Sequence, residues 1–409
     1  MPEINKQNRR DLAQSAANKA SAIGSDIDLS RYTDDGDDYT YEEDPSKLPD
    51  EEKASMLRAG VMLDDLSQRS GTFVQKDQKP VHFSTLQEGV EVMSTSEARR
   101  KYEWLENYWW NAVKVDSDKY TASLEINETD GYFIRTLPGV KSAFPVQACL
   151  YLGHKNISQR VHNIVIAEEG SELHIITGCT THPMSAGLHL GVSEFYIKKG
   201  ATVSFTMIHN WAPDIEVRPR STVIVEEDGV FLNNYISMKP VRTMQMYPTA
   251  HLVGPNSIAR FNSVLVATEG SFMDVGSRAI LDAEGARAEI ISRTITTGGT
   301  IIARGDIQAN KPEVIGHLEC RGLILGEAGT IHAIPELVGR VANVDLSHEA
   351  AVGKIAEEEV EYLMARGLTR DEATAMIVRG FLNVDIEGLP PDLEAELQRT
   401  IEESEKDLF

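Results

Sequence analysis

Short apolar runs rich in β-branched residues recur between glycine corners from about residue 132 to residue 348. Examples are HNIVIA, SELHIIT and STVIVEE, and helical periodicity is absent throughout this stretch. The pattern predicts an all-β region. Recurring short strands with glycine or asparagine corners are typical of a parallel β-helix, in which each coil buries its inward face on the next. The periodicity is loose, so a β-sandwich remains the main competing interpretation.

A helical arm is predicted before the β region. Residues 1–23 are polar and partly helical in pattern, and further helical stretches run from residue 50 to about 66 and from 96 to 112. The last stretch, SEARRKYEWLENYWWNA, is rich in aromatic residues. We expect this aromatic cluster to pack the arm against the β region, because large rings gain most by burial.

Two short helices are predicted after the β region. The first spans residues 355–366, and the second begins at a capping box of Thr369 and Glu372 and runs to about Asn383. An acidic helix then closes the chain. Two short helices bury little apolar surface alone, so we expect them to pack on the β region or on another protein. The apolar positions predicted to face inward are Ile355, Val360, Leu363 and Met364 in the first helix and Ala373, Met376, Ile377 and Phe381 in the second.

Three regions follow from these patterns: an N-terminal helical and acidic region (1–130), a β core (131–348) and a C-terminal helical region (349–409). The segment 26–52 is dense in acids, and we expect it to be an exposed or disordered linker.

The charge balance narrows the classes of partner. The 409 residues carry 40 Lys plus Arg against 63 Asp plus Glu, a formal net charge of −23. Such a chain repels polyanions, so nucleic acid and anionic membranes are poor partners. The sequence contains no apolar run long enough to span a membrane and no secretory signal pattern, so we expect a cytoplasmic protein.

The familiar catalytic motifs are missing. The sequence contains no GxxxxGK[ST], GxGxxG, GxSxG or HExxH. We therefore expect no nucleotide bound by this chain and no ordinary catalytic framework. A β-helix enzyme acting on polysaccharides is an alternative, but it would call for an acid pair or basic residues along one groove, and for secretion.

Cysteine provides the candidate chemistry. The three cysteines, Cys149, Cys179 and Cys320, are odd in number and form no CxxC, which argues against a disulfide framework or a zinc knuckle. Cys179 follows Gly178 directly after the strand-like run LHIIT, where a turn would leave the thiol reachable. Cys320 precedes Arg321, which could favour the thiolate. Each cysteine is either core or a reactive ligand.

A third polar group lies at the predicted change from strands to helices. Ser347, His348 and Glu349 are consecutive, and imidazole beside carboxylate offers nitrogen and oxygen ligands for iron. A solvated surface pair is the competing interpretation.

The stretch LSHEAAVGKIAEEEVEYLMARGLTRDEATAMIVRGFL (346–382) resembles the C-terminal signature of the SufB/SufD family, scaffold proteins of the SUF iron–sulfur assembly machinery. Further matches are GYFIRTLPGVKSAFPVQ, IVIAEEGSELHIITGCTT, MIHNW and HLECRGLILGEAG, so the resemblance covers roughly residues 130–390. It implies a right-handed parallel β-helix core. It also implies that the helices over about 355–383 dock a SufC-like ABC ATPase. The docking candidates are Glu359, Leu363, Met364, Met376, Ile377 and Phe381.

The resemblance also implies roles for individual residues. Cys320 matches the cysteine on which the nascent cluster is built, Glu349 its acidic partner, and His348 a histidine at the paired interface. Cys179 matches a cysteine proposed to receive sulfur. His209-Asn210-Trp211 matches a family motif to which the sequence alone assigns no chemistry.

Some positions depart from the family pattern. SufB typically reads EHEAT and SufD reads SHGAT where this chain reads SHEAA, so it keeps histidine and glutamate in one subunit. Tyr151 and Gly153 stand where SufB has polar residues of its sulfur path.

The resemblance therefore predicts a non-enzymatic scaffold that builds a transient iron–sulfur cluster from iron and sulfur donors and passes it to apo-proteins. The chain would pair with itself, as a homodimer, or with a SufD-like subunit. The alternative is a SufD-like structural partner that holds the ATPase and never binds iron.

Overall fold

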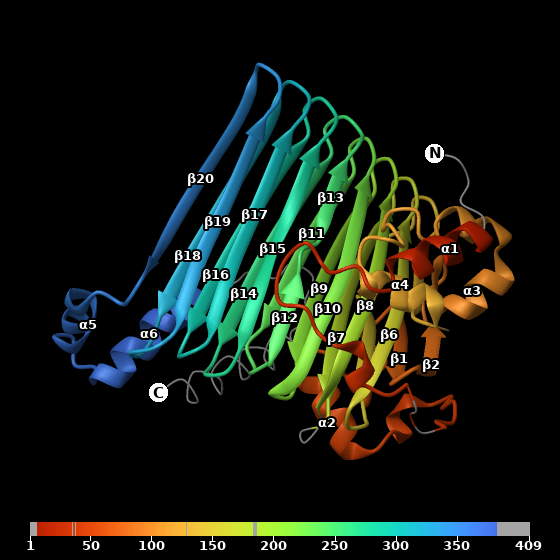
Figure 1. Ribbon diagram of the computed structural model, residues 1–409, viewed down its shortest axis with the longest axis horizontal. Helices are drawn as coiled ribbons and strands as arrows, with labels where there is room; N and C mark the ends of the chain where they lie inside the picture. The colour runs from red at the N-terminus through yellow and green to blue at the C-terminus, as the bar shows by residue number, and fades with distance from the viewer. Residues whose placement is uncertain (1–5, 35, 37, 128, 183–185, 383–409) are drawn as a thin grey trace.

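The chain folds into a flattened rod of stacked β coils with helices at both ends (Figure 1). The computed structural model describes residues 6–382, except 35, 37, 128 and 183–185. Two ten-stranded sheets form the long faces of the rod, and successive coils pair in parallel. The expected mainly β fold with a parallel β-helix core is therefore confirmed, and the β-sandwich is excluded.

The chain alternates between the two sheets as it winds along the rod. In spatial order, the first sheet contains β2 (Lys79–Thr85), β1 (Gly71–Lys76), β5 (Val146–Leu152), β7 (Glu172–Thr181), β9 (Thr202–Asn210), β11 (Val230–Ser237), β14 (Ile258–Ala267), β16 (Arg287–Thr296), β18 (Val314–Ile324) and β20 (Val344–Gly353). The second contains β19 (Thr330–Gly339), β17 (Thr300–Ala309), β15 (Phe272–Leu281), β12 (Thr243–Met246) with β13 (Thr249–Leu252), β10 (Asp214–Val225), β8 (Ala186–Ile197), β6 (Ile157–Ala167), β4 (Tyr132–Thr136) and β3 (Val90–Ser94).

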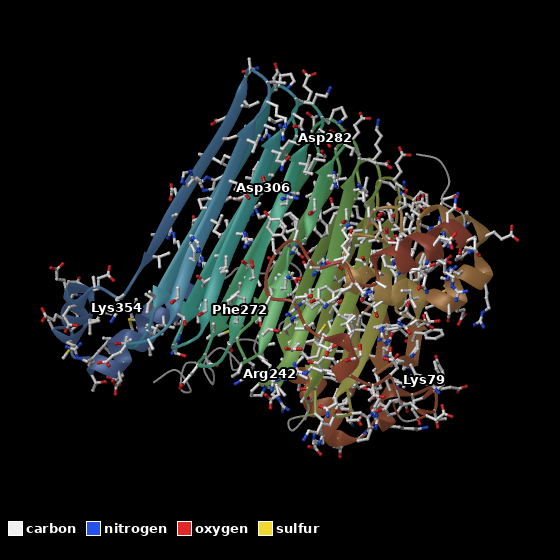
Figure 2. The ribbon with its side chains drawn as sticks, viewed as in Figure 1. Lys79, Arg242, Phe272, Asp282, Asp306 and Lys354 are labelled. Carbon is white, nitrogen blue, oxygen red and sulfur yellow. The ribbon has the colours of Figure 1, made fainter. Side chains whose placement is uncertain are left out.

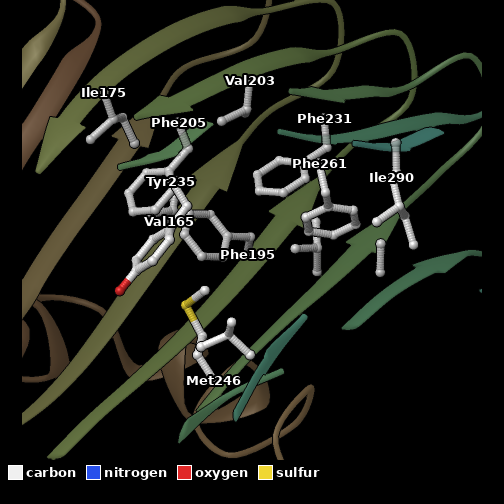
Figure 3. Packing of buried hydrophobic residues seen from close by; sticks show 14 of the residues in the cluster. Val165, Ile175, Phe195, Val203, Phe205, Phe231, Tyr235, Met246, Phe261 and Ile290 are labelled. Carbon is white, nitrogen blue, oxygen red and sulfur yellow. The ribbon is translucent and has the colours of Figure 1, made fainter. Parts of the chain in front are cut away.

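The core of the rod is a stack of inward-facing side chains. Alternate residues of each strand face inward, and parallel pairing in register aligns them in rows along the rod. Phe195, Phe205, Phe231 and Phe261 form a chain of edge-to-face and tilted contacts at the centre (Figure 3). Such contacts add to the free energy gained by burying the rings.

The corners between coils use the left-handed backbone region. Gly170, Gly200, Gly270 and Gly285 have positive φ angles between 63° and 83°, as the corner pattern suggests. At the corner before β11, Asp228 rather than Gly229 adopts this conformation, with φ 55°.

The N-terminal region contains more than the expected helices. Its helices are α1 (Lys6–Ala16), η1 (Leu29–Arg31), η2 (Pro45–Lys47), α2 (Asp50–Arg58), α3 (Thr95–Lys101), η3 (Glu103–Asn107) and α4 (Lys119–Ile126). The strands β1, β2 and β3, which the sequence analysis missed, begin the rod, and β1–β2 and β3–β4 are its antiparallel pairs.

The acidic segment 26–52 lies on the body of the protein, so the expectation of a disordered linker is wrong for its described residues. Many of its side chains are exposed, but Asp34 pairs with Arg160 and Asp38 with Lys79. These ion pairs offset part of the repulsion among the acids.

The aromatic cluster packs the arm against the rod, as predicted. Trp109 and Trp110 lie against His162 with ring centroids 3.8 and 4.4 Å apart. The fully buried Glu194 accepts hydrogen bonds from the backbone N–H groups of Trp110, Ala112 and Val113 at 2.6–3.0 Å and contacts His162 Nε2 at 2.9 Å.

Replacing Glu194 with alanine is expected to lower the free energy of unfolding by about 3–5 kcal/mol, because buried N–H groups and a buried imidazole lose their partner. Denaturant unfolding measures this loss. Glu226→Ala, which removes a partly exposed ion pair with Lys198, is the control and should cost less than about 1 kcal/mol. Equal losses in the two variants would contradict the assigned role of Glu194.

The C-terminal helices are α5 (Glu357–Met364) and α6 (Arg370–Leu382). The capping box is confirmed: Glu372 Oε2 accepts from the backbone N–H of Thr369, and Thr369 Oγ1 accepts from that of Glu372. α6 packs on the outer face of the first sheet through Val378 and Leu382, and Ala373 is also buried. Met376, predicted to face inward, is 51% exposed. The predicted closing helix lies outside the described residues.

The strands end later than predicted. β20 continues to Gly353, so His348 and Glu349 lie within a strand and not at its junction with the helices. Lys354, labelled in Figure 2, lies between β20 and the C-terminal helices.

Candidate functional site

Cys320 lies on β18 with its side chain facing into the rod. It is 2% exposed and packs in the same cluster as Leu318 and Ile290. Burial, and then the nearby Glu319 carboxylate, raise the pKa of the Cys320 thiol to about 11. Arg321 is on the opposite face, where its Nε lies 2.8 Å from Glu319 Oε1. The expectation that Arg321 favours the thiolate is therefore wrong.

The register of β18 and β20 decides which predicted ligands share a face. Leu318 pairs with His348, Glu319 with Glu349 and Cys320 with Ala350. Neighbours in a parallel pair point to the same side of the sheet, so His348 shares the inward face of Cys320. Glu349 lies on the outward face beside Glu319. The dipeptide is thus divided between the two faces of the last strand.

β19 and β20 form the end of the rod, which no other described strand covers (Figure 1). They are the last strands of their sheets, and His348 and Glu349 are both exposed. Val352, near the end of β20, is 41% exposed, so the helices that follow it in sequence do not bury it. An end strand with free backbone N–H and C=O groups is a template for pairing with another chain. Among the described residues, no group of three or more His, Cys, Asp and Glu side chains is placed to hold a metal ion.

Cys179 lies inside β7 and not at a turn. It is 0% exposed, and burial raises the pKa of its thiol well above the usual range. The expectation that Gly178 forms a turn and leaves the Cys179 thiol reachable is therefore wrong. A Cβ atom at Gly178 would lie 2.5 Å from the carbonyl oxygen of Ala59, so glycine permits a close approach of the N-terminal region and makes no turn.

Cys149 is also buried, but on the outward face of its sheet. It packs beneath the N-terminal region with Met56, Val61 and Tyr151. Gly153, two residues after Tyr151, donates its backbone N–H to Asp77. Neither Tyr151 nor Gly153 belongs to the cluster that fills the rod.

The sequence analysis assigned no chemistry to a polar cluster inside the rod. His209, Trp211 and Tyr235 are each less than 5% exposed, and the ring centroid of His209 lies 5.2 Å from that of Trp211 and 4.9 Å from that of Tyr235. The sequence does indicate that His209 faces inward. In ATVSFTMIHN it follows the same alternation as Val203, Phe205 and Met207, which face inward.

The predicted docking residues lie on α5 and α6 and remain accessible. Glu359, Met364 and Met376 are exposed, while Leu363, Ile377 and Phe381 are half-buried. Phe381 also packs against the apolar cluster on the rod that contains Val378 and Leu382, whereas Leu363, Met364, Met376 and Ile377 do not belong to that cluster.

Comparison with known proteins identifies the family. The model of the SufBD core domain of the SUF system for FeS cluster assembly matches residues 151–381. The chain belongs to the SufBD family. An iron-sulfur cluster assembly SufBD family protein of Archaeoglobus fulgidus is 57% identical over 358 residues, which cover 88% of this chain and 96% of the relative. A homologue from Methanothermobacter thermautotrophicus (strain Winter) is 48% identical over 96% of this chain and 98% of its own length.

A more distant SufBD protein, from Pyrococcus horikoshii, is 31% identical over 87% of this chain and 81% of its own length. The matched core spans β18, β20 and both C-terminal helices, so the candidate site lies within the family region. In the described part of the chain, no helix is long and apolar enough to cross a membrane.

Proposed function

We propose that this SufBD protein is a scaffold that builds a labile iron–sulfur cluster and transfers it to apo-proteins, in complex with a SufC-like ABC ATPase. The observation that carries the proposal is the placement of Cys320 and His348 on one face at the open end of the rod. Thiolate and imidazole are ligands that iron accepts in such clusters. The chain itself performs assembly, and ATP hydrolysis belongs to the partner.

The incompleteness of the site supports pairing of two chains. One chain offers a single cysteine on the last coils, Cys320, and a second copy, or a SufD-like subunit, would supply the remaining ligands. Pairing of two copies through β19 and β20 would place both sites across a twofold axis. Few thiolates and weaker nitrogen and oxygen ligands would leave the cluster easy to release. Cys179 is the proposed acceptor of sulfur from a sulfur donor. A separate iron donor of the cytoplasm would supply the iron of the cluster.

Burial of Cys320 requires a movement before iron can bind. The docking residues of α5 and α6 follow β20 directly, and α6 packs on the coils that contain β16 and β18. We infer that ATP-driven closure of the docked ATPase moves the last coils and exposes the thiol. Contact between Arg293 Nη1 and the carbonyl oxygen of Phe381, at 3.1 Å, joins the helix to the rod.

Anaerobic reconstitution with ferrous iron and sulfide tests the proposal. The complex of this chain with its ATPase is expected to develop visible absorbance that is lost on incubation with an apo-protein acceptor. A colourless complex that still stimulates ATP hydrolysis would instead favour the second candidate, a SufD-like partner that binds no iron. The low exposure of Cys320 is the observation that favours this alternative.

Replacing Glu349 with alanine is expected to lower the cluster yield about tenfold, the scale of loss for a carboxylate that supports a metal site from outside its ligand set, without lowering the melting temperature. Glu349 is exposed, so its removal leaves no buried group unpaired. Asp345→Ala, on the same exposed face of β20, is the matched control and should keep the yield. Iron and sulfide per chain and a thermal melt are measured for both. A parallel fall in yield and melting temperature would point to a structural role.

A further inference from the structure

The two ends of the rod differ in how the first sheet finishes. β2 is its end strand at the N-terminal end, and β20 is its end strand at the opposite end (Figure 1). β20 is covered by no other described strand and contains neither lysine nor proline. β2 begins with Lys79 and Pro80, residue types that natural sheets place on edges because they discourage pairing with another chain. The sheet therefore has one open edge and one protected edge.

Residues 41–42 occupy the outer edge of β2. The Tyr41 hydroxyl donates to the carbonyl oxygen of Phe83 at 2.9 Å and accepts from the backbone N–H of Phe83 at 3.4 Å. The backbone N–H of Glu42 donates to the carbonyl oxygen of Val81 at 2.7 Å. The carbonyl oxygen of Glu42 accepts in turn from His82 Nδ1, which lies 2.8 Å away. This short segment therefore bonds to the backbone groups with which a further strand would pair.

The end strand of the second sheet, β3, is also bonded to a side chain at this end. The backbone N–H of Val92, in the middle of β3, donates to Thr85 Oγ1 at 3.0 Å. Thr85 is the last residue of β2, so the two end strands meet at this corner of the rod. An edge N–H that already has an acceptor is not available to a strand of another molecule. Both sheets are therefore protected at the N-terminal end.

Burial of the ring does not account for the position of Tyr41. Its side chain is 44% exposed and meets Phe83 edge to face, with ring centroids 5.4 Å apart. The hydroxyl instead bonds both backbone groups of a single edge residue. Glu43 and Asp44, which follow directly, are exposed at the same end. Two copies that met at this end would bring these like charges together, which opposes their pairing.

We propose that residues 41–42 form an end cap that prevents a second copy of this chain from pairing with β2. A second copy presents the same strand, and two β2 strands related by a twofold axis would pair through the groups that Tyr41 and Glu42 now bond. If both ends of the rod were free to pair, copies would join into an open chain. With one end capped, assembly closes at two copies. This last consequence rests on the proposed pairing through β19 and β20, whereas the cap itself does not.

Sedimentation velocity of the full-length chain over a range of concentrations tests the cap. The double variant Tyr41→Phe/Glu42→Pro removes the hydroxyl and the N–H that bond to the edge, and so frees the backbone of Phe83 and Val81. We expect a species of twice the wild-type mass, with a dissociation constant for this doubling at least about tenfold below that of the wild type, because the freed groups can bond across the new contact. An unchanged mass, or growth without a discrete doubling, would overturn the proposal.

Tyr39→Phe is the matched control. Tyr39 lies two residues before Tyr41, but its hydroxyl donates to Asp77 Oδ2 at 2.8 Å and lies 3.1 Å from His154 Nδ1. Its loss loosens the same segment and leaves both bonding groups of the cap in place. The variant should therefore keep the wild-type mass. Equal doubling in Tyr39→Phe would overturn the proposal, since loosening of the segment alone would then suffice. Melting temperatures of the variants are measured alongside.

A measurement on the wild type does not depend on the folding of variants. Hydrogen exchange of the Glu42 amide is expected to be slow, because this N–H donates to Val81, and exchange as fast as in an unfolded peptide would overturn the cap. The masses also separate the cap from the proposed function. A wild type that stays a single copy, with a double variant that reaches two, would support the cap and contradict pairing through β20. A wild type of two copies, with a double variant of the same mass, would overturn the cap alone.

Discussion

Cys320→Ser is expected to abolish the visible absorbance that forms when the protein and its ATPase are reconstituted with ferrous iron and sulfide. Serine keeps the shape of the inward side chain, but its hydroxyl is a poor substitute for the thiolate that iron–sulfur clusters prefer. Cys320 is the cysteine that lies on the last coils of the rod, where it pairs in register with Ser292 of β16. We expect less than about a tenth of the wild-type iron per chain, the scale of loss for a metal ligand.

Cys149→Ser provides the matched control for this loss. Cys149 is buried to the same degree but lies on the outward face beneath the N-terminal region, far along the rod from β20. Its variant should retain the chromophore. Full absorbance in Cys320→Ser, or equal losses in both variants, would rule out Cys320 as the thiolate that holds the cluster.

Met376→Glu is expected to abolish co-purification of this chain with its ATPase while the rod stays folded. Met376 is 51% exposed on α6, so the charge costs little in the free chain. In a docked complex the carboxylate would be buried without a partner, which costs several kcal/mol and lowers the affinity by more than about 100-fold. Co-elution on gel filtration and a thermal melt are the measurements.

Leu86→Glu is the control for the docking prediction. It makes the same change at an exposed apolar side chain, 45% exposed, in the loop after β2 at the other end of the rod. It should leave co-elution unchanged. Retained co-elution in Met376→Glu would contradict docking through this face of α6. Phe381→Glu is less informative, because Phe381 also packs against the apolar cluster beneath α6.

The strands of the rod could be predicted because alternation of apolar and polar residues is a local property. The same alternation was present in GTFVQK, KPVHFST and VEVMS, which form β1, β2 and β3 but lie among segments with a helical pattern. Gly178 shows the limit of local signals. Its role is to admit Ala59, which is more than 100 residues away in sequence, and only the folded chain shows that contact.

The placement of the candidate site residues could be predicted only in part. The family resemblance singled out Cys320, His348 and Glu349, and the register places two of them on one face. The separation of Glu349 from Cys320 follows from the extension of β20 to Gly353, which the sequence analysis ended too early. Burial of Cys320 also depends on coils that precede it, so no local pattern could distinguish a core thiol from an accessible one.

Native mass spectrometry of the anaerobically reconstituted complex tests most directly whether two chains hold a cluster between their open ends. The masses of iron and sulfide are expected only on species that contain two SufBD-type subunits, and never on complexes formed with Cys320→Ser. Iron and sulfide bound to a species with a single SufBD-type subunit, or bound equally to the Cys320→Ser complex, would contradict a shared cluster at this end of the rod.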